Sequence, residues 1–231
     1  MFELSPAEWE AVRLSLKVGF WSTAFSLPVG FFLAYVLARR EFPLKSLLNG
    51  LVYLPLVLPP VVTGLILLML FGTQGPAGKF LESVFGVTIA FRWTGAALAA
   101  AIMGLPLMVR AMRLSIEAVD TRLEHAARTL GASWWRAFFT VTLPLSLPGI
   151  IAGAILSFAK SFGEFGATIT FVSNIPGETQ TLPIAIYSFL QTPNGEGPAV
   201  RLAILSVVVS MAAIVGAEWM ERRVTRRLRP A

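Results

Sequence analysis

The sequence contains no cysteine and only one histidine among its 231 residues. The missing cysteines exclude disulfide bonds, thiolate catalysis and cysteine-ligated metal sites, and a single histidine cannot form a histidine cluster around a metal. Charged residues are scarce, at 14% of the chain against about 25% in soluble domains. Because the mean hydropathy is +0.71, polar groups are too few to cover a globular surface, which favours a membrane protein.

Five stretches of the chain carry no charged residue, and they predict five transmembrane helices. Three are long enough for the roughly 20 residues that a spanning helix needs, and the other two reach that length when charged residues at their ends are included. We therefore expect a single all-α membrane domain, 1–231, with spans at about 14–38, 46–71, 93–114, 137–163 and 199–220.

Lysine and arginine are spread unevenly over the segments between these spans. If the N-terminus lies outside, 13 of the 19 basic residues fall on the cytoplasmic side. Such a bias sets the orientation of membrane proteins, so we expect the N-terminus outside and the C-terminus in the cytoplasm. The basic tail, Arg222 to Arg229, would then contact anionic membrane lipid. The net charge of +6 is thus explained mainly by topology, and we expect no nucleic-acid partner.

Helix-breaking residues are concentrated in two places. Segment 161–198 is rich in glycine and proline, which indicates irregular backbone near the outer face with a short helix at Leu182 to Leu190. This segment is either re-entrant, surrounded by protein or a water-filled cavity, or a plain external loop. Within the second charge-free run, prolines predict a kink that either lines a pathway or is only structural. The prolines are Pro55, Pro59 and Pro60, and Gly64 follows them.

Segment 121–131 predicts a short amphipathic helix in the cytoplasm. Thr121 and Glu124 have the spacing of a capping box, and Gly131 is placed to end the helix. One helical face carries apolar residues at i, i+3, i+4 and i+7. That face either docks into a groove on a partner protein or packs beneath its own membrane bundle. Its residues are Leu123, Ala126, Ala127 and Leu130.

This segment resembles the cytoplasmic motif of ABC importer permease subunits, which reads Glu-Ala-Ala, three residues, Gly, nine residues, Ile-x-Leu-Pro. Ala126-Ala127, Gly131 and Leu143-Pro144 match it in type and spacing, and Val141 replaces the isoleucine. One departure is that His125 occupies the usual glutamate position, with Glu124 one residue earlier. The resemblance implies a type I, MetI-like permease fold and a coupling helix that docks on a separate ATPase. It assigns the docking residues Arg122, Leu123, Glu124, His125, Ala126, Ala127, Leu130 and Gly131.

Two further stretches, Leu54 to Gly64 and Ser161 to Tyr187, resemble molybdate permeases, and sulfate permeases share their Gly-Glu-Phe-Gly core. The resemblance implies a homodimer in the inner membrane of a prokaryote, which imports molybdate, or tungstate or sulfate, delivered by an external oxyanion-binding protein. A channel or secondary transporter without an ATPase is the rival interpretation. The coupling motif and the lack of charged residues within the spans argue against it.

The chain lacks the residues for hydrolysing ATP itself. The string closest to a P-loop has Thr73 where the first glycine belongs, and Phe80 cannot ligate magnesium. We therefore expect a transport subunit rather than an enzyme, with no bound cofactor or metal. ATP and magnesium would be used by the partner ATPase.

Lys160 and Glu164 are charged residues near the outer end of the fourth span. Lys160 either attracts an oxyanion into the pathway, with Glu164 tuning it, or the two form an interfacial ion pair, which we favour. Small polar and helix-breaking residues nearby complete the candidates for the pathway. They are Pro59, Pro60, Thr63, Gly64, Gly163 and Thr168.

Overall fold

The computed structural model describes residues 4–228, except for the side chains of 217, 221 and 224–228. In this part of the chain all regular structure is helical, and no β-strand is present. The elements in chain order are α1 (Pro6–Arg39), α2 (Lys45–Val57), α3 (Pro60–Phe71), α4 (Pro76–Phe85), α5 (Trp93–Glu117), α6 (Thr121–Thr129), α7 (Trp134–Ala137), the π-helical η1 (Phe138–Thr142), α8 (Leu143–Phe162), α9 (Gly166–Val172), α10 (Leu182–Leu190) and α11 (Glu196–Leu228).

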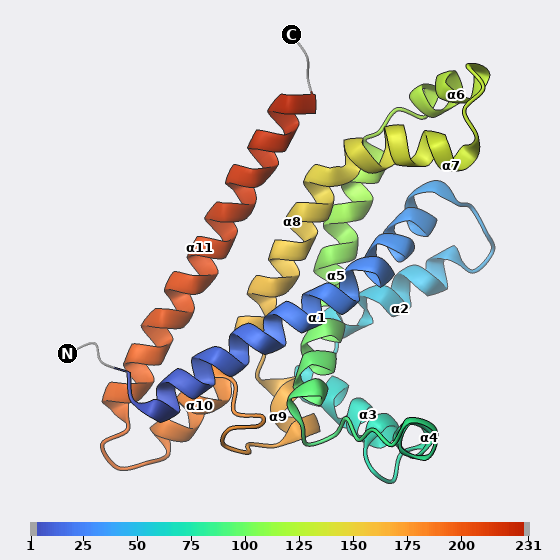
Figure 1. Cartoon of the computed structure of the whole chain (residues 1–231). Coiled ribbons are helices and arrows are strands. Elements are labelled where there is room, and N and C mark those ends of the chain that lie inside the picture. The colour runs from blue at the N-terminus through green and yellow to red at the C-terminus, as the bar shows by residue number, and fades with distance from the viewer. Residues whose placement is uncertain (1–3, 229–231) are drawn as a thin grey trace.

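The long helices α1, α5, α8 and α11 form the bundle, and α1 crosses α5 and α8 obliquely (Figure 1). The short helices lie at its two ends: α6 and α7 at one end, and α3, α4, α9 and α10 at the other (Figure 1). The N-terminal end of α1 lies with α10, whereas α11 ends on the side of α6 and α7. The two ends of the described chain therefore lie at opposite ends of the bundle.

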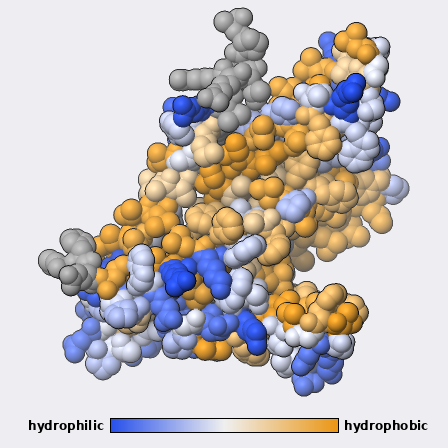
Figure 2. All heavy atoms as spheres, viewed as in Figure 1, coloured by the Kyte–Doolittle hydropathy of each residue, from blue (hydrophilic) through white to orange (hydrophobic). Residues whose placement is uncertain are grey.

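Within residues 4–228, four stretches of helix are long and apolar enough to cross a membrane, and a fifth span results if the bent pair α2 and α3 is counted as one. The four are Pro6–Arg39, Trp93–Glu117, Trp134–Phe162 and Glu196–Met220. Orange, hydrophobic residues cover the middle of the visible face, and blue residues gather toward both ends (Figure 2). This distribution fits a bundle that is surrounded by lipid at its middle.

The second predicted span is not one kinked helix, because α2 and α3 meet at 113°. Leu58 and Pro59 both have extended backbone, with ψ of 143° and 132°. A residue that precedes proline avoids the helical region, and here two such residues stand in succession. Two extended residues turn the chain sharply, so α3 leaves the direction of α2.

Small residues allow α5 and α8 to approach closely. A Cβ atom on Gly153 would lie 2.9 Å from the carbonyl oxygen of Met108. Gly104 lies against Ser157 and Gly149 against Ser115, also without room for a side chain. Lipid supplies no hydrophobic driving force between helices, so this tight packing is what holds the pair together.

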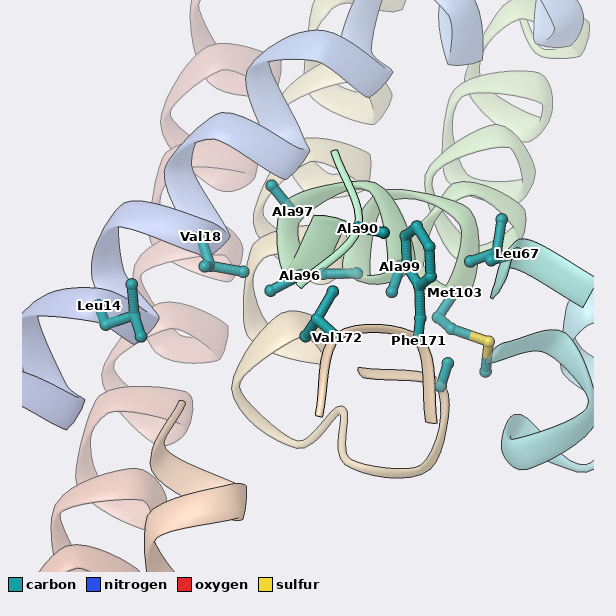
Figure 3. Packing of buried hydrophobic residues seen from close by; sticks show 12 residues of the cluster. Leu14, Val18, Leu67, Ala90, Ala96, Ala97, Ala99, Met103, Phe171 and Val172 are labelled. Carbon is teal, nitrogen blue, oxygen red and sulfur yellow. The ribbon is translucent and has the colours of Figure 1, made fainter. Parts of the chain in front are cut away.

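In the half of the bundle that contains α9, the buried core consists mostly of small residues packed around the side chain of Phe171. Alanines of α5 pack against Phe171 and Val172, which point toward them from α9 (Figure 3). Leu67 of α3 and Leu14 of α1 belong to the same cluster. Since Phe171 and Val172 are completely buried, α9 is built into the bundle and is not part of an exposed loop.

Candidate functional site

Helix α6 begins one residue earlier than the capping pattern predicts. Asp120 is the N-cap, and its carboxylate accepts a hydrogen bond of 2.8 Å from the amide of Arg122. The predicted capping box of Thr121 and Glu124 is therefore wrong, because the aspartate one position earlier takes the cap and Glu124 bonds elsewhere. The helix ends at Thr129, and Gly131 follows it with φ of 90°, a left-handed conformation that favours glycine.

No residue of α6 is buried, and its apolar face is open. Leu123 is 49% exposed and Leu130, just after the helix, is 89% exposed. Arg122, His125 and Arg128 are exposed around them. The interpretation in which this face packs beneath its own bundle is therefore wrong, and the face is free to contact another protein.

Glu124 differs from the other predicted docking residues because its carboxylate is turned toward the bundle. Its Oε1 accepts hydrogen bonds from Nη2 of Arg39, at 3.1 Å, and from Oγ1 of Thr142, at 2.7 Å. The same Nη2 also donates to the carbonyl oxygen of Val119, at 2.9 Å. One carboxylate therefore joins the end of α1, the first turn of α6 and the end of η1.

The π-helical turn η1 lies between α7 and α8. Pro144 has no amide hydrogen, so the carbonyl of Thr140 lacks the donor that a regular α-helix would give it. The wider turn directly before Pro144 fits this gap, and such turns occur frequently at functional sites. Aromatic rings join η1 and α7 to α1: Phe138 lies 5.5 Å from Tyr35, 5.9 Å from Phe31 and 5.6 Å from Trp134, between ring centroids.

At the other end of the bundle, the structure brings together pathway candidates from two distant segments. A Cβ atom on Gly64 of α3 would lie 2.6 Å from the carbonyl oxygen of Ala167 in α9. One on Gly166 would lie 2.8 Å from Cβ of Pro60. Thr63 and Thr168 are both buried, whereas Pro59 only marks the start of α3. The two helices thus touch backbone to backbone.

Lys160 and Glu164 form an ion pair, with 2.6 Å between Nζ and Oε2. Glu164 is only 2% exposed, and its Oε1 accepts a hydrogen bond of 3.1 Å from the amide of Ala167. Gly163 ends α8 directly before it. Within the described residues, the carboxylate is thus occupied by contacts that fix the break between α8 and α9.

Residues that sequence reasoning missed include both partners of the ion pair between the buried Glu8 and the partly exposed Arg201. The guanidinium of Arg201 donates to both carboxylate oxygens of Glu8, from Nε at 2.9 Å and from Nη2 at 3.1 Å. Arg39 and Thr142 were also missed. No signal could have identified these partners, because Arg39 is 85 residues from Glu124 and Arg201 is 193 residues from Glu8. Among the residues that the structure describes, no group of acidic residues and histidine is suited to hold a metal ion.

Residues 26–226 match the protein family described as "binding-protein-dependent transport system inner membrane component". The chain is 58% identical to the molybdenum transport system permease protein ModB of Escherichia coli strain K12, over 95% of this chain and 96% of that protein. It is 53% identical to ModB of Haemophilus influenzae, over 96% of each chain. It is 38% identical to the sulfate transport system permease protein CysW of Synechococcus elongatus, over 86% of this chain and 70% of that protein.

Solved structures share the fold at lower identity. A bacterial ABC transporter that imports the acidic polysaccharide alginate matches with a TM-score of 0.75 at 19% identity, over 96% of this chain and 81% of that one. An inward-facing conformation of the MetNI methionine ABC transporter matches with a TM-score of 0.67 at 17% identity, over 94% of each chain. The expected type I importer fold is confirmed.

Proposed function

The chain belongs to the family of binding-protein-dependent transport system inner membrane components, and from that premise we propose that it imports molybdate. It is the membrane-spanning permease subunit of an ABC importer and not an enzyme, since ATP is hydrolysed by a separate subunit. The observation that supports molybdate as the substrate is the 58% identity to a molybdenum permease over nearly the whole length of the chain.

Sulfate is the second candidate substrate, because the sulfate permease CysW matches at 38%. Molybdate, tungstate and sulfate are all tetrahedral dianions at neutral pH, so one passage can carry any of them. We place the choice among them in an external oxyanion-binding protein that delivers the anion. The solved alginate importer in complex with its substrate-bound periplasmic protein supports a delivery step of this kind.

The exposed face of α6 is the proposed docking surface for the ATPase. Leu123 and Leu130 present apolar area, and arginines around them offer charge to an acidic rim. Small residues at Ala126 and Ala127 let the wall of a cleft approach the helix closely. Glu124 is excluded from this surface because its carboxylate is bonded to Arg39 and Thr142.

The passage itself forms between two copies of the chain. A bundle whose described residues form at most five candidate spans has little room for an internal pathway, whereas a symmetric dimer encloses one on its axis. We propose that α3 and α9 border it, because both combine buried small polar groups with backbone contact. ATP binding draws the two docked α6 helices together and opens the passage outward, and hydrolysis returns it inward.

Orientation follows from the basic residues. We propose the inner membrane of a prokaryote, with the N-terminus outside and with α6 and α7 in the cytoplasm, where an ATPase is available. The tail that is proposed to contact anionic lipid includes Arg226, Arg227 and Arg229, whose side chains lie outside the described residues.

The test is reconstitution of the permease with its cognate ATPase and binding protein in lipid vesicles. Uptake of molybdate, tungstate and sulfate is measured by elemental analysis, with and without ATP inside the vesicles. We expect ATP-dependent uptake of molybdate. Uptake of sulfate alone would transfer the assignment to sulfate, and equal uptake without ATP or ATPase would indicate a channel.

A further inference from the structure

Helix α1 is held by an ion pair at each of its ends. Near its start, Glu8 pairs with Arg201 of α11, and its last residue, Arg39, pairs with Glu124 of α6. Every other ion pair in the described part of the chain joins residues four positions apart. Among the side chains that the structure describes, only these two pairs connect separate elements, and α1 belongs to both.

The pair at the α6 end fixes a helix that has little else to hold it. None of the residues in α6 is buried, and the buried apolar side chain nearest to it in the sequence is that of Val119, which precedes the helix. Glu124 and Arg39 are shielded, with side chains 22% and 12% exposed, and Thr142 adds a third contact from η1. A displacement of α6 is therefore transferred to the end of α1 through charge-assisted hydrogen bonds, which are stronger than neutral ones.

The opposite end of α1 is tied to α10 and α11. Glu8 is fully buried, and the fork of Arg201 binds both of its oxygens. Ser15, two turns further on, accepts a hydrogen bond of 2.7 Å from the amide of Leu182, the first residue of α10. The first part of α1 thus moves together with the two helices that follow α9.

Between these ends, α1 is a single helix of 34 residues that continues through Pro28. At about 1.5 Å per residue it reaches across roughly 50 Å, from the α6 end of the bundle to the α10 end (Figure 1). A continuous helix is much stiffer than the loops beside it. A pull on its last residue can therefore reach its first turns along one continuous element, although α1 also packs against α5 and α8 on the way.

We propose that α1 transmits the movement of α6 to α10 and α11, and that Glu124 is a positioning residue in this connection and not a contact to the ATPase. This inference rests on the proposed function, because it requires that α6 docks on an ATPase. Its consequence is specific: breaking the pair leaves docking and ATP hydrolysis in place but separates hydrolysis from transport.

The experiment uses the full complex in vesicles and measures three quantities: ATPase co-purified per permease, ATP hydrolysed, and molybdate imported. In Glu124→Ala we expect normal association, ATP hydrolysis within about twofold of the wild type, and import per ATP lowered about tenfold. That factor is typical for the loss of one charge-assisted hydrogen bond. Glu124→Gln keeps a neutral acceptor for Arg39 and Thr142, so import per ATP should be partly restored.

Two further variants test whether the pair acts as a unit. Arg39→Ala should reproduce Glu124→Ala, and the double variant should be no worse than either single one. The matched control is Glu41→Ala, which removes an exposed ion pair with Lys45 close to the end of α1. This variant should import as much molybdate per ATP as the wild type.

The pair of Glu8 and Arg201 is tested by Arg201→Lys, which keeps the positive charge but cannot bind both carboxylate oxygens in the same way. Combined with Glu124→Ala, it should lower import per ATP less than the product of the two single effects, because both pairs lie on one connection. Independent effects would overturn the inference. A loss of ATPase association in Glu124→Ala would also overturn it, because Glu124 would then be a docking contact. Unchanged import per ATP in that variant would overturn it as well. Failure of the wild-type complex to bind an ATPase or to import an oxyanion would instead refute the proposed function.

Discussion

Gly64 of α3 lies directly against Ala167 of α9. A Cβ atom at Gly64 would lie 2.6 Å from the carbonyl oxygen of Ala167 and 2.8 Å from Cβ of Thr170. Neither obstacle is the far end of a flexible side chain, so the two helices would have to separate. The contact therefore depends on the absence of a side chain at this one position.

Gly64→Val is expected to destabilise the permease by about 1–3 kcal/mol, the usual cost of overpacking, and to abolish import. Thermal unfolding of the purified protein and uptake into vesicles measure the two effects. Gly50→Val is the matched control, because nothing lies within 4 Å of a Cβ atom at Gly50 in α2. Wild-type stability and import in Gly64→Val would show that the close contact between α3 and α9 is not required.

Features that depend on neighbouring residues can be predicted from the sequence, whereas features that depend on residues far apart in the chain cannot. Helix α10 occupies the range that its glycine and proline boundaries predict, Leu182 to Leu190, because helix ends are determined locally. The sharp turn at Leu58 and Pro59 was expected only as a kink, since prolines in sequence do not give an angle. In the same way, Asp120 displaced Thr121 as the cap of α6, because both residues suit that role and only the backbone decides between them.

The long-range contacts could not be predicted. Glu124 was assigned to the docking surface on the basis of a motif, and its spacing carries no information about Arg39, which lies 85 residues away. The buried Glu8 belongs neither to the coupling motif nor to the permease-like stretches of the sequence. A lone acid in a sequence gives no sign that an arginine near the other end of the chain will pair with it.

The exposed leucine at the end of α6 yields a prediction about docking. Leu130→Glu should reduce co-purification of the ATPase about tenfold or more, because a charge replaces an apolar side chain that a partner would bury. The fold should be unaffected, since Leu130 is 89% exposed in the permease alone. Leu190→Glu provides the control: Leu190 is also exposed, at 57%, but it ends α10 at the opposite end of the bundle. Equal association of the ATPase with both variants would contradict the docking surface.

The ion pair of Lys160 and Glu164 predicts an effect on stability and little effect on substrate affinity. Lys160→Gln removes the charged partner of a carboxylate that is 2% exposed, so we expect a loss of about 1–3 kcal/mol. The KM for molybdate should change by less than about threefold, because Lys160 already bonds Glu164 at 2.6 Å. Kinetics of uptake and thermal unfolding separate the two effects. Lys45→Gln, which breaks an exposed pair, should leave both quantities unchanged. A large rise in KM with normal stability would assign Lys160 to the passage instead.

The absence of cysteine permits a direct test of orientation, because any introduced cysteine is the only thiol in the chain. Glu41 and Gln191 are both exposed; Glu41 follows α1 and Gln191 follows α10, and these two helices end at opposite ends of the bundle (Figure 1). If 13 of the 19 basic residues face the cytoplasm, a maleimide that cannot cross membranes should label Gln191→Cys in intact cells. It should label Glu41→Cys only after the cells are permeabilised, and the parent protein should not be labelled at all. The reverse pattern would place α6 outside, out of reach of any ATPase. It would then contradict the orientation and the docking proposal together, since both require the same end of the bundle to face the cytoplasm.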